Sequence, residues 1–347
     1  MSRKLRVGIV STGHIAAVIA DAITRSRHAR VSAVSSRRQS AADSFAEPFG
    51  AKAFSDWRWL VAWEGIDAVY VATPTAVREQ ICLAAAGNKK HVLAEKPFAS
   101  LDSVRRIGNE CLKNRVAFMD ATHFVHHPRT LMIKQAIAER YGPPQSLHSA
   151  FFYPLMDTEN VRYVTDMEPM GALADMGWYS MRAITEYLCA GVEVANASVY
   201  LQRHEKTGSV IRAAGFLQFV DGKTSSFDVG YNLDVRLMDL SIICLGGNIF
   251  LDDFVVDWQK GFIFDNPGHE VGFTAKSGAV TPTDFDFIKT PTQRPPHVSM
   301  IDDFAGLAAN RDEKAIAASI EVSRNTQRLV DTIWRQGIDT EKQQDRR

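Results

Sequence analysis

A lysine stands directly after an apolar run and directly before a proline, in the triplet Glu95-Lys96-Pro97. Burying an ammonium group at the end of an apolar strand costs free energy, so a lysine in this position usually has a chemical task. Pro97 fixes the backbone beside it, and an X–Pro bond can be cis, which would turn the Lys96 side chain sharply out of a sheet. The triplet therefore indicates a cation held in one direction at the edge of a binding site.

A tyrosine and an aspartate further along the chain could supply proton chemistry. Asp175 and Tyr179 follow Gly171 in a segment that favours a helix, where residues four apart share one face. A nearby Lys96 would lower the pKa of the phenol, which could then exchange a proton with a substrate hydroxyl. Asp175 could orient Lys96 or the substrate. An amphipathic helix with a core tyrosine and an N-terminal aspartate has the same pattern, and only the fold can bring Lys96 and Tyr179 together.

Small residues between an apolar run at 5–10 and a helical pattern at 15–25 suit a dinucleotide. The fingerprint G-x-G-x-x-G/A lets the backbone approach a pyrophosphate at a helix N-terminus. Here the pattern is Ser11-x-Gly13-x-x-Ala16, with serine in place of the first glycine. A strand, turn and helix that bind nothing would fit the same residues, so the motif needs support from elsewhere in the chain.

The residues after the second predicted strand favour NADP over NAD. An acid here would hold the ribose 2′-hydroxyl of NAD, but residues 32–42 contain none. Ser36, Arg37 and Arg38 offer a hydroxyl and two guanidinium groups instead, which suit a 2′-phosphate. The alternative interpretation is a solvated basic loop.

Three histidines within five residues, His123, His126 and His127, first suggest a metal ion. They lead into Pro128, which we expect to end a strand, and no set of cysteines or carboxylates accompanies them. We therefore predict no metal site, with His123 lining a substrate pocket and the other two histidines structural.

The elements that must position these residues alternate between strand and helix over the first 120 residues. Strands are predicted at 5–10, 31–35, 68–72, 91–94 and 116–119, and helices at 15–25, 77–86 and 101–113. This alternation predicts an α/β fold with a parallel, doubly wound sheet.

After Pro128 the pattern changes to consecutive strands at 196–203, 209–219, 223–231, 236–244 and 247–256. Such a meander is antiparallel and can leave one face open. Helices at 298–309 and 314–335 close the chain, and 340–347 should fray. We predict a Rossmann domain (1–125) and an α+β domain with an open, mostly antiparallel sheet for substrate and oligomerisation (126–300). The C-terminal helices (301–347) should pack back on the first domain.

The composition is that of a soluble globular protein, with 46% hydrophobic and 23% charged residues among 347. Forty basic residues balance forty acidic ones, which argues against nucleic acid or an anionic membrane as a partner. The four cysteines have no ligand spacing, and no apolar run reaches the length of a signal peptide or a membrane span. These features predict a cytoplasmic protein with reduced thiols.

Four motifs occur in the order and spacing of one known family: residues 8–16, Ala72-Thr73-Pro74, Glu95-Lys96-Pro97 and residues 171–179. On these, the chain resembles the Gfo/Idh/MocA oxidoreductases, the glucose–fructose oxidoreductase and inositol dehydrogenase superfamily, over essentially its whole length. Segments 119–130 and 171–184 look most like the dihydrodiol dehydrogenase and NADP-linked sugar dehydrogenase branch. Two residues depart from the family: Ser11 replaces the first glycine, and Arg78 stands where a histidine often follows Thr-Pro-x-x-x.

The resemblance implies site residues. Lys96, Asp175 and Tyr179 would be catalytic, and His123 and Trp178 would contact the substrate. The residues that would bind the cofactor are Ser11, Thr12, Gly13, His14, Ile15, Ser36, Arg37, Arg38, Ala72, Thr73, Pro74, Glu95 and Lys96.

The resemblance also implies a homodimer or homotetramer through the second sheet. Its predicted strands carry alternating apolar positions, at Phe216, Phe219, Phe227, Val229 and Leu233. If no helix of the chain covers this face, it should form an interface. The alternative is that the closing helices cover it.

Together these features predict an NADP-preferring oxidoreductase, with NAD as the alternative cofactor, that moves a hydride between nicotinamide and a carbinol carbon of a sugar, polyol or dihydrodiol. Two alternatives stay open. One is an enzyme of the same fold that keeps and recycles bound NAD(P), such as a glycosidase, an epimerase or another oxidoreductase. The other is a non-catalytic nucleotide sensor, against which the retention of Lys96, Asp175 and Tyr179 argues.

Overall fold

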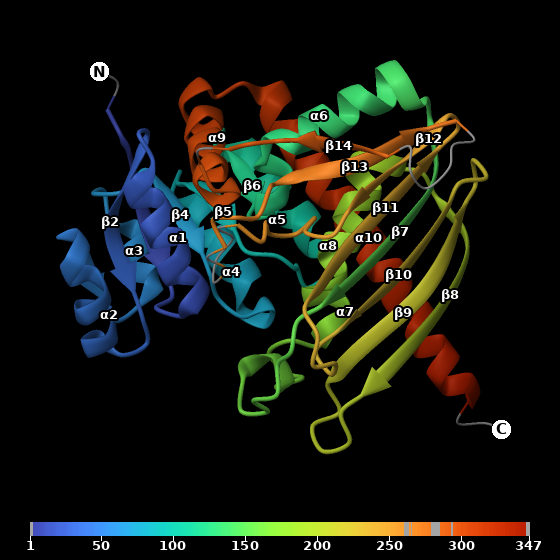
Figure 1. The fold of residues 1–347 in the computed structure, drawn as a ribbon. Helices are drawn as coiled ribbons and strands as arrows, with labels where there is room; N and C mark the ends of the chain where they lie inside the picture. The colour runs from blue at the N-terminus through green and yellow to red at the C-terminus, as the bar shows by residue number, and fades with distance from the viewer. Residues whose placement is uncertain (1–2, 260–263, 265, 279–284, 293, 345–347) are drawn as a thin grey trace. The chain divides into compact units, whose positions relative to one another are not determined.

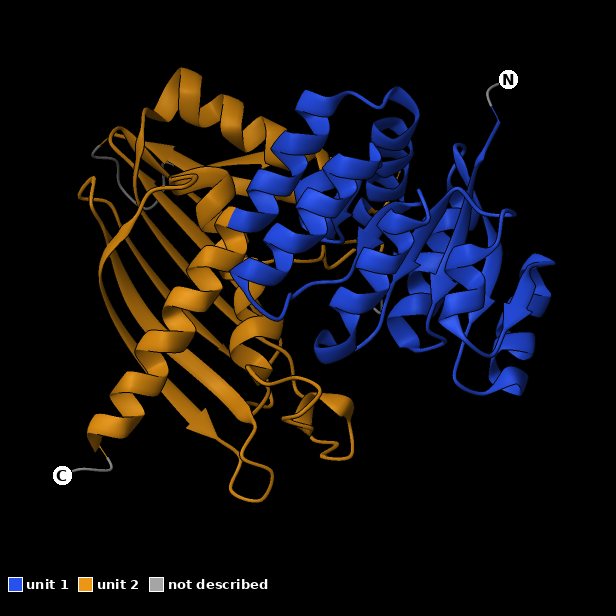
Figure 2. Ribbon diagram, turned by 180° about the vertical axis from the view of Figure 1, so that it is seen from behind, with its two compact units in different colours: residues 1–126, 296–324 blue, residues 127–295, 325–347 orange. Residues whose placement is uncertain are grey.

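The computed structural model describes residues 3–259, 264, 266–278, 285–292 and 294–344, which form two compact units. Unit 1 comprises Met1–His126 and Pro296–Arg324, and unit 2 comprises His127–Pro295 and Asn325–Arg347 (Figure 2). The second division falls inside the last helix, so that its second half groups with unit 2. The domain boundaries at 125 and 300 stay predictions, because a compact unit need not fold independently.

Unit 1 is built on a six-stranded sheet in the order β3-β2-β1-β4-β5-β6, with every neighbouring pair parallel (Figure 1). Its strands are β1 (Leu5–Val10), β2 (Ala29–Ser35), β3 (Lys52–Phe54), β4 (Ala68–Val71), β5 (His91–Ala94) and β6 (Phe118–Asp120). Every residue of β4 and β5 is buried, as expected where helices cover both faces of a parallel sheet. This strand order places the ligand-binding edge at the carboxyl ends of the strands.

The α-helices of unit 1 are α1 (His14–Arg25), α2 (Gln39–Ala46), α3 (Trp57–Ala62), α4 (Thr75–Gly87), α5 (Leu101–Asn114), α9 (Pro296–Asn310) and the first part of α10 (Glu313–Gln344). From the C-terminal region, α9 returns to pack against α1. The sequence pattern did not predict α2, β3 and α3, which span only three to eight residues each, too few for a clear periodicity. It also placed β6 two residues too early.

Unit 2 contains an eight-stranded sheet in the order β14-β13-β12-β11-β7-β10-β9-β8. Its strands are β7 (Pro144–Phe152), β8 (Val194–Arg203), β9 (Val210–Phe219), β10 (Thr224–Gly230), β11 (Leu237–Cys244), β12 (Gly247–Leu251), β13 (Gly272–Ser277) and β14 (Asp286–Lys289). Its helices are α6 (Pro128–Ala136), α7 (Gly171–Asp175), α8 (Gly177–Ala183) and the second half of α10 (Glu313–Gln344). None of the described helices combines the length and the apolar character that crossing a bilayer requires.

The expectation of a simple meander is wrong at one place. Strand β7, which was not predicted, lies between β10 and β11 and runs parallel to β10. All other neighbouring pairs in this sheet are antiparallel, so the predicted mostly antiparallel sheet is confirmed. The last predicted strand is also too long, since β12 ends at Leu251. In addition, α10 continues to Gln344 instead of fraying from residue 340.

One face of this sheet packs against helices of the same unit. Phe219, Phe227 and Val229 are buried, α7 contacts β9, and α8 contacts β7 and β10. The idea that these side chains form an uncovered face is therefore wrong, and Leu233 lies in the turn after β10. Phe216 points to the other face, where it is 46% exposed.

The open face has a regular cross-strand row. From β8 to β14 the register aligns Ser198, Phe216, Ser226, His148, Ser241, Phe250, Thr274 and Phe287. At its centre, His148 Nδ1 lies 2.6 Å from Ser226 Oγ, and Nε2 lies 3.0 Å from Ser146 Oγ. Aromatic side chains flank this polar centre on both sides.

Candidate active site

The turn between β1 and α1 leaves backbone N–H groups available for an anion. Gly13 is the N-cap of α1, and no side chain caps the helix. Ser11 has a φ of 133°, a value that favours glycine, which is why the fingerprint normally has glycine there. The Ser11 hydroxyl accepts a hydrogen bond from the Gly13 N–H at 3.1 Å, which offsets part of the strain. The helix N-terminus therefore retains the geometry that binds phosphate groups.

The end of β2 lies beside this turn. Thr12 Oγ1 donates to Ser36 Oγ at 3.2 Å, so the two cofactor-binding segments predicted from the sequence are joined. Arg37 and Arg38 follow Ser36, and both are exposed at the start of α2. Neither forms an ion pair in the part of the chain that the structure describes. Both guanidinium groups are thus available to a solvent-borne anion.

The segments after β4 and β5 lie at the same edge of the sheet. Ala72 donates its N–H to Val10 O at 3.1 Å, which places the Thr73-Pro74 loop next to the phosphate turn. Glu95 is buried, and the Tyr70 hydroxyl donates to its Oε1 at 2.6 Å. Lys96 is partly exposed, and the Lys96–Pro97 peptide bond is cis. Unit 1 thus brings Lys96 and the predicted cofactor-binding residues to one edge.

The three histidines near residue 125 have separate surroundings. His123 is buried in a short helical turn, His123–His126, and His126 Nδ1 lies 2.6 Å from Asp303 Oδ2. Pro128 begins α6 and does not end a strand, which corrects the sequence interpretation. His127 caps that helix by accepting the Arg129 N–H, and burial with the Arg129 charge lowers its pKa to about 3.

The predicted helix carrying Asp175 and Tyr179 is two short helices. Asp175 ends α7, Gly177 begins α8, and the chain is interrupted at Met176. Gly171 has a φ of 49°, and a β-carbon there would lie 2.3 Å from the carbonyl oxygen of Val210. Glycine is therefore required for α7 to approach β9 so closely.

Asp175 is held from two directions. Its Oδ2 accepts from Arg162 Nε at 2.5 Å and from the Tyr231 hydroxyl at 2.8 Å. The charge of Asp175 raises the pKa of Arg162, and burial followed by that same charge raises the pKa of Tyr231. The sequence analysis missed Arg162 and Tyr231, because they lie 13 and 56 residues from Asp175.

Tyr179 is 8% exposed and meets Phe151 edge to face, with ring centroids 5.4 Å apart. Trp178 is completely buried, and its assignment to the substrate stays a prediction. The catalytic roles of Lys96, Asp175 and Tyr179 also stay predictions.

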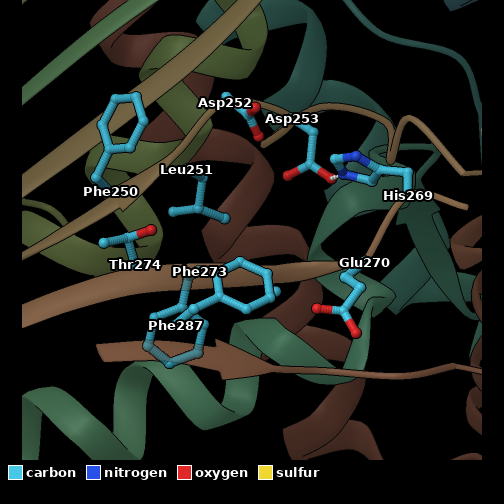
Figure 3. Close-up of a pocket in the computed structure, with 10 residues that line it drawn as sticks. Phe250, Leu251, Asp252, Asp253, His269, Glu270, Phe273, Thr274 and Phe287 are labelled. Carbon is cyan, nitrogen blue, oxygen red and sulfur yellow. Dashed lines mark ion pairs between the residues drawn. The ribbon is translucent and has the colours of Figure 1, made fainter. Parts of the chain in front are cut away.

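A cavity of about 130 Å³ in unit 2 lies outside these residues. Figure 3 shows Asp252, Asp253 and His269 converging beside it, with their ligand atoms within 4.8 Å of one another. Burial raises the pKa of Asp253, and its ion pair with the buried Arg129 offsets only part of that rise. Because the carboxylate of Asp253 already forms an ion pair with Arg129, we interpret the cluster as structural.

Comparisons with known proteins agree with this geometry. Residues 5–121 match the model of an oxidoreductase family described by an NAD-binding Rossmann fold, Gfo/Idh/MocA. The chain is similar to dTDP-3,4-didehydro-2,6-dideoxy-alpha-D-glucose 3-reductases. The identity is 30% with that of Streptomyces antibioticus, over 72% of this chain and 76% of that one. With that of Actinomadura kijaniata it is also 30%, over 60% of this chain and 62% of that one, so the match spans about three fifths of this relative. A D-xylose 1-dehydrogenase (NADP(+)) from Haloferax volcanii is 29% identical over 64% of this chain and 69% of its own.

Solved structures share the fold. A 3-ketoreductase from Actinomadura kijaniata in complex with NADP and TDP-benzene superposes with a TM-score of 0.84 at 22% identity, covering 95% of this chain and 97% of that one. An aldose-aldose oxidoreductase from Caulobacter crescentus gives 0.83 at 17% identity, covering 97% and 98%.

Proposed function

Because the chain belongs to the Gfo/Idh/MocA oxidoreductase family, with its NAD-binding Rossmann fold, we propose that it is an NADP-preferring dehydrogenase or reductase of a sugar or related polyol. One observation carries the proposal: the uncapped N-terminus of α1 is joined to Ser36, next to the exposed Arg37 and Arg38. The relatives named as keto-sugar reductases and as an NADP(+) xylose dehydrogenase support a sugar carbinol as the reacting group.

The residues of unit 1 fit a nicotinamide dinucleotide. The backbone N–H groups of His14 and Ile15 would meet the pyrophosphate, since no side chain caps them. Ser36, Arg37 and Arg38 would hold a 2′-phosphate. The remaining contacts would come from Ser11, Thr12, Gly13, Ala72, Thr73, Pro74, Glu95 and Lys96.

When bound, the nicotinamide ring would accept or supply a hydride at its C4 atom. In our proposal the phenolate oxygen of Tyr179 takes the proton of a substrate hydroxyl during oxidation, and the neutral Tyr179 hydroxyl gives a proton to the substrate oxygen during reduction. The Lys96 ammonium favours the phenolate form of Tyr179. Asp175 orients the substrate or Lys96, and it does so as a carboxylate because Arg162 and Tyr231 both donate to Oδ2. His123 and Trp178 line the substrate side.

In our proposal the regions that contain the two sheets have different functions. Residues 1–125 bind the cofactor, 126–300 provide the substrate side and an interface between copies of the chain, and 301–347 complete the fold. Two copies would associate through the open face described above. A cytoplasmic location suits the four cysteines, all of which are unpaired and buried.

The experiment is a screen of aldoses, keto sugars, polyols and dihydrodiols with NADP, NADPH, NAD and NADH. The reaction is followed by nicotinamide absorbance at about 340 nm and by chromatography of the sugar. We expect an absorbance change that is stoichiometric with product and larger with the phosphorylated cofactor. Conversion of a sugar without an absorbance change would replace the proposal by internal recycling of the cofactor. Cofactor binding without any conversion across the screen would contradict it.

A further inference from the structure

Arg78 joins two loops at the cofactor edge of unit 1. It lies in the first turn of α4 and is 4% exposed. Its guanidinium donates to the main-chain carbonyl oxygens of Thr73 and Pro97, and to the Thr75 hydroxyl at 3.3 Å. Thr73 belongs to the loop after β4 and Pro97 to the loop after β5. One side chain therefore ties together both segments that the sequence analysis assigned to the cofactor.

A buried guanidinium in this position contributes less to the stability of the core than an apolar side chain would. The acceptors of Arg78 are two carbonyls and a hydroxyl, and among the described residues no carboxylate forms an ion pair with it. Its Nε is buried without a hydrogen-bond partner. Burying a cation against neutral acceptors is costly, and an apolar side chain of similar length would pack there at less cost. The two loops to which Arg78 donates its hydrogen bonds indicate a role in positioning those loops.

The bond to Pro97 acts on the residue that follows Lys96. On the other side of Lys96, Glu95 is fixed by the Tyr70 hydroxyl at 2.6 Å and by its own N–H, which donates to Val71 O at 2.9 Å. The main chain of Lys96 is thus anchored at both neighbours, one anchor coming from β4 and the other from α4. Arg78 is the anchor that also reaches the Thr73 carbonyl.

We propose that Arg78 is a positioning residue, whose guanidinium holds the loops after β4 and β5 at one spacing and so fixes the direction of the Lys96 ammonium group. This inference rests on the proposed function for the task of Lys96. The histidine that often stands here in the family has one N–H donor in its neutral form and can reach a single carbonyl. A lysine has a point charge on a flexible stem and would hold the two carbonyls less rigidly. Arginine reaches both at once.

The test compares R78K, R78H and R78M with R106M. Arg106 is an exposed residue of α5 that pairs with Glu79 of α4, so its loss removes an arginine from the same helix pair without touching the loops. For R78M we expect kcat to fall by about 10²-fold, the scale of a misplacement of about 1 Å. KM should rise less than kcat falls, with partial rescue in R78K and less in R78H. R106M should match the parent protein.

A second readout does not depend on turnover. The rate at which limiting acetic anhydride acetylates Lys96 depends on the surroundings of its amine. Mass spectrometry measures this rate relative to that of the exposed Lys113. We expect the relative rate at Lys96 to change more than about threefold in R78H and R78M, against no change in R106M. If the parent protein turns over no sugar, the proposed function fails while the labelling still tests Arg78. If R78M does not fold, the kcat values and the Lys96 labelling rates of R78H and R78K test the proposal in its place. Folded variants with the parent's labelling rate and kcat would overturn the proposal.

Discussion

At the scale of the residue, the candidate site depends on side chains that are held in place by their neighbours. Asp175 accepts two hydrogen bonds at Oδ2, from Arg162 and Tyr231, which hold its side chain in one orientation. The Tyr179 ring is fixed by its edge-to-face contact with Phe151. The proposed proton carrier and the proposed orienting carboxylate are therefore each held in place within unit 2, as groups that act in acid–base catalysis must be.

Substitution of the proposed proton carrier tests this arrangement. Tyr179→Phe keeps the ring and its packing but removes the hydroxyl, and Lys96→Met keeps the stem but removes the cation. Each should lower kcat by about 10²–10⁴-fold. Because the pair acts as a unit, the kcat of the double variant should be only a little lower than that of the less active single variant. Steady-state kinetics with the sugar found in the screen measures this, with Tyr200→Phe on the open face as the control. A Tyr179→Phe variant within a few-fold of the parent would make Tyr179 a packing residue and His123 the next candidate.

We expect single residues to decide the cofactor preference as well. Replacing both Arg37 and Arg38 by alanine should remove charge-assisted hydrogen bonds worth roughly 1.5–3 kcal/mol each. The dissociation constant for NADPH should rise strongly, while that for NADH changes little. Fluorescence titration measures both constants, and Arg58→Ala, which loses an exposed ion pair with Asp56, is the matched control. Equal affinity of the parent protein for the two cofactors would refute the assignment.

At the scale of the element, the first residue of β5 is a buried histidine, and its hydrogen bonds join β5 to the segments just before β4 and β6. The His91 N–H donates to Asp67 O at 3.0 Å, and its Nδ1 accepts from the Ala117 N–H at 2.9 Å, just before β6. Burial, and then the charge of Arg311, lower the pKa of His91 to about 4. The imidazole is therefore neutral in the folded chain at pH values where an unfolded chain would begin to protonate it.

This shift predicts a pH dependence of stability. The unfolded chain binds the proton near pH 6.5 and the folded chain only near pH 4, so the stabilisation is complete above about pH 6.5 and decreases as the pH falls to about 4. The full decrease is about 3 kcal/mol. His91→Asn keeps an acceptor for Ala117 but does not titrate, so its free energy of unfolding should decrease less between pH 7 and 4.5. Urea unfolding measures this, with the exposed His28→Asn as control; parallel pH curves for His91→Asn and the parent would contradict the prediction.

At the scale of the whole molecule, the second sheet has one face covered by its own helices and one that is open. The open face combines Tyr200, Phe216 and Phe250, which are 51%, 46% and 39% exposed, with the hydrogen-bonded polar centre around His148. Exposed aromatic side chains around a polar network are typical of an interface between subunits.

We therefore expect the parent protein to be at least a dimer at micromolar concentration. Phe216→Glu places a charge beside the polar centre of the proposed interface and should halve the molar mass of a dimer measured by light scattering. The control Trp59→Glu changes a 69% exposed aromatic residue of unit 1 and should leave the mass unchanged. A monomeric parent protein would exclude this interface.

The sequence by itself determined those features that depend on neighbouring residues. The strand and helix alternation of the first 120 residues and four short motifs, among them the turn at Ser11–Gly13 and Glu95-Lys96-Pro97, were enough to predict the Rossmann sheet, the family and the nicotinamide cofactor, and all three are confirmed. Periodicity and small-residue turns are local properties, because side-chain direction repeats along one strand or helix.

Only the tertiary structure decided which distant segments meet. It inserted β7 beside β10, so that a predicted meander became a mixed sheet, and it covered the face that carries Phe219 and Phe227. It also paired Asp175 with Tyr231, across 56 residues, and brought Arg78 to the carbonyl of Pro97. No local pattern encodes such partners, because they depend on where the chain returns and on which buried polar groups must then be satisfied.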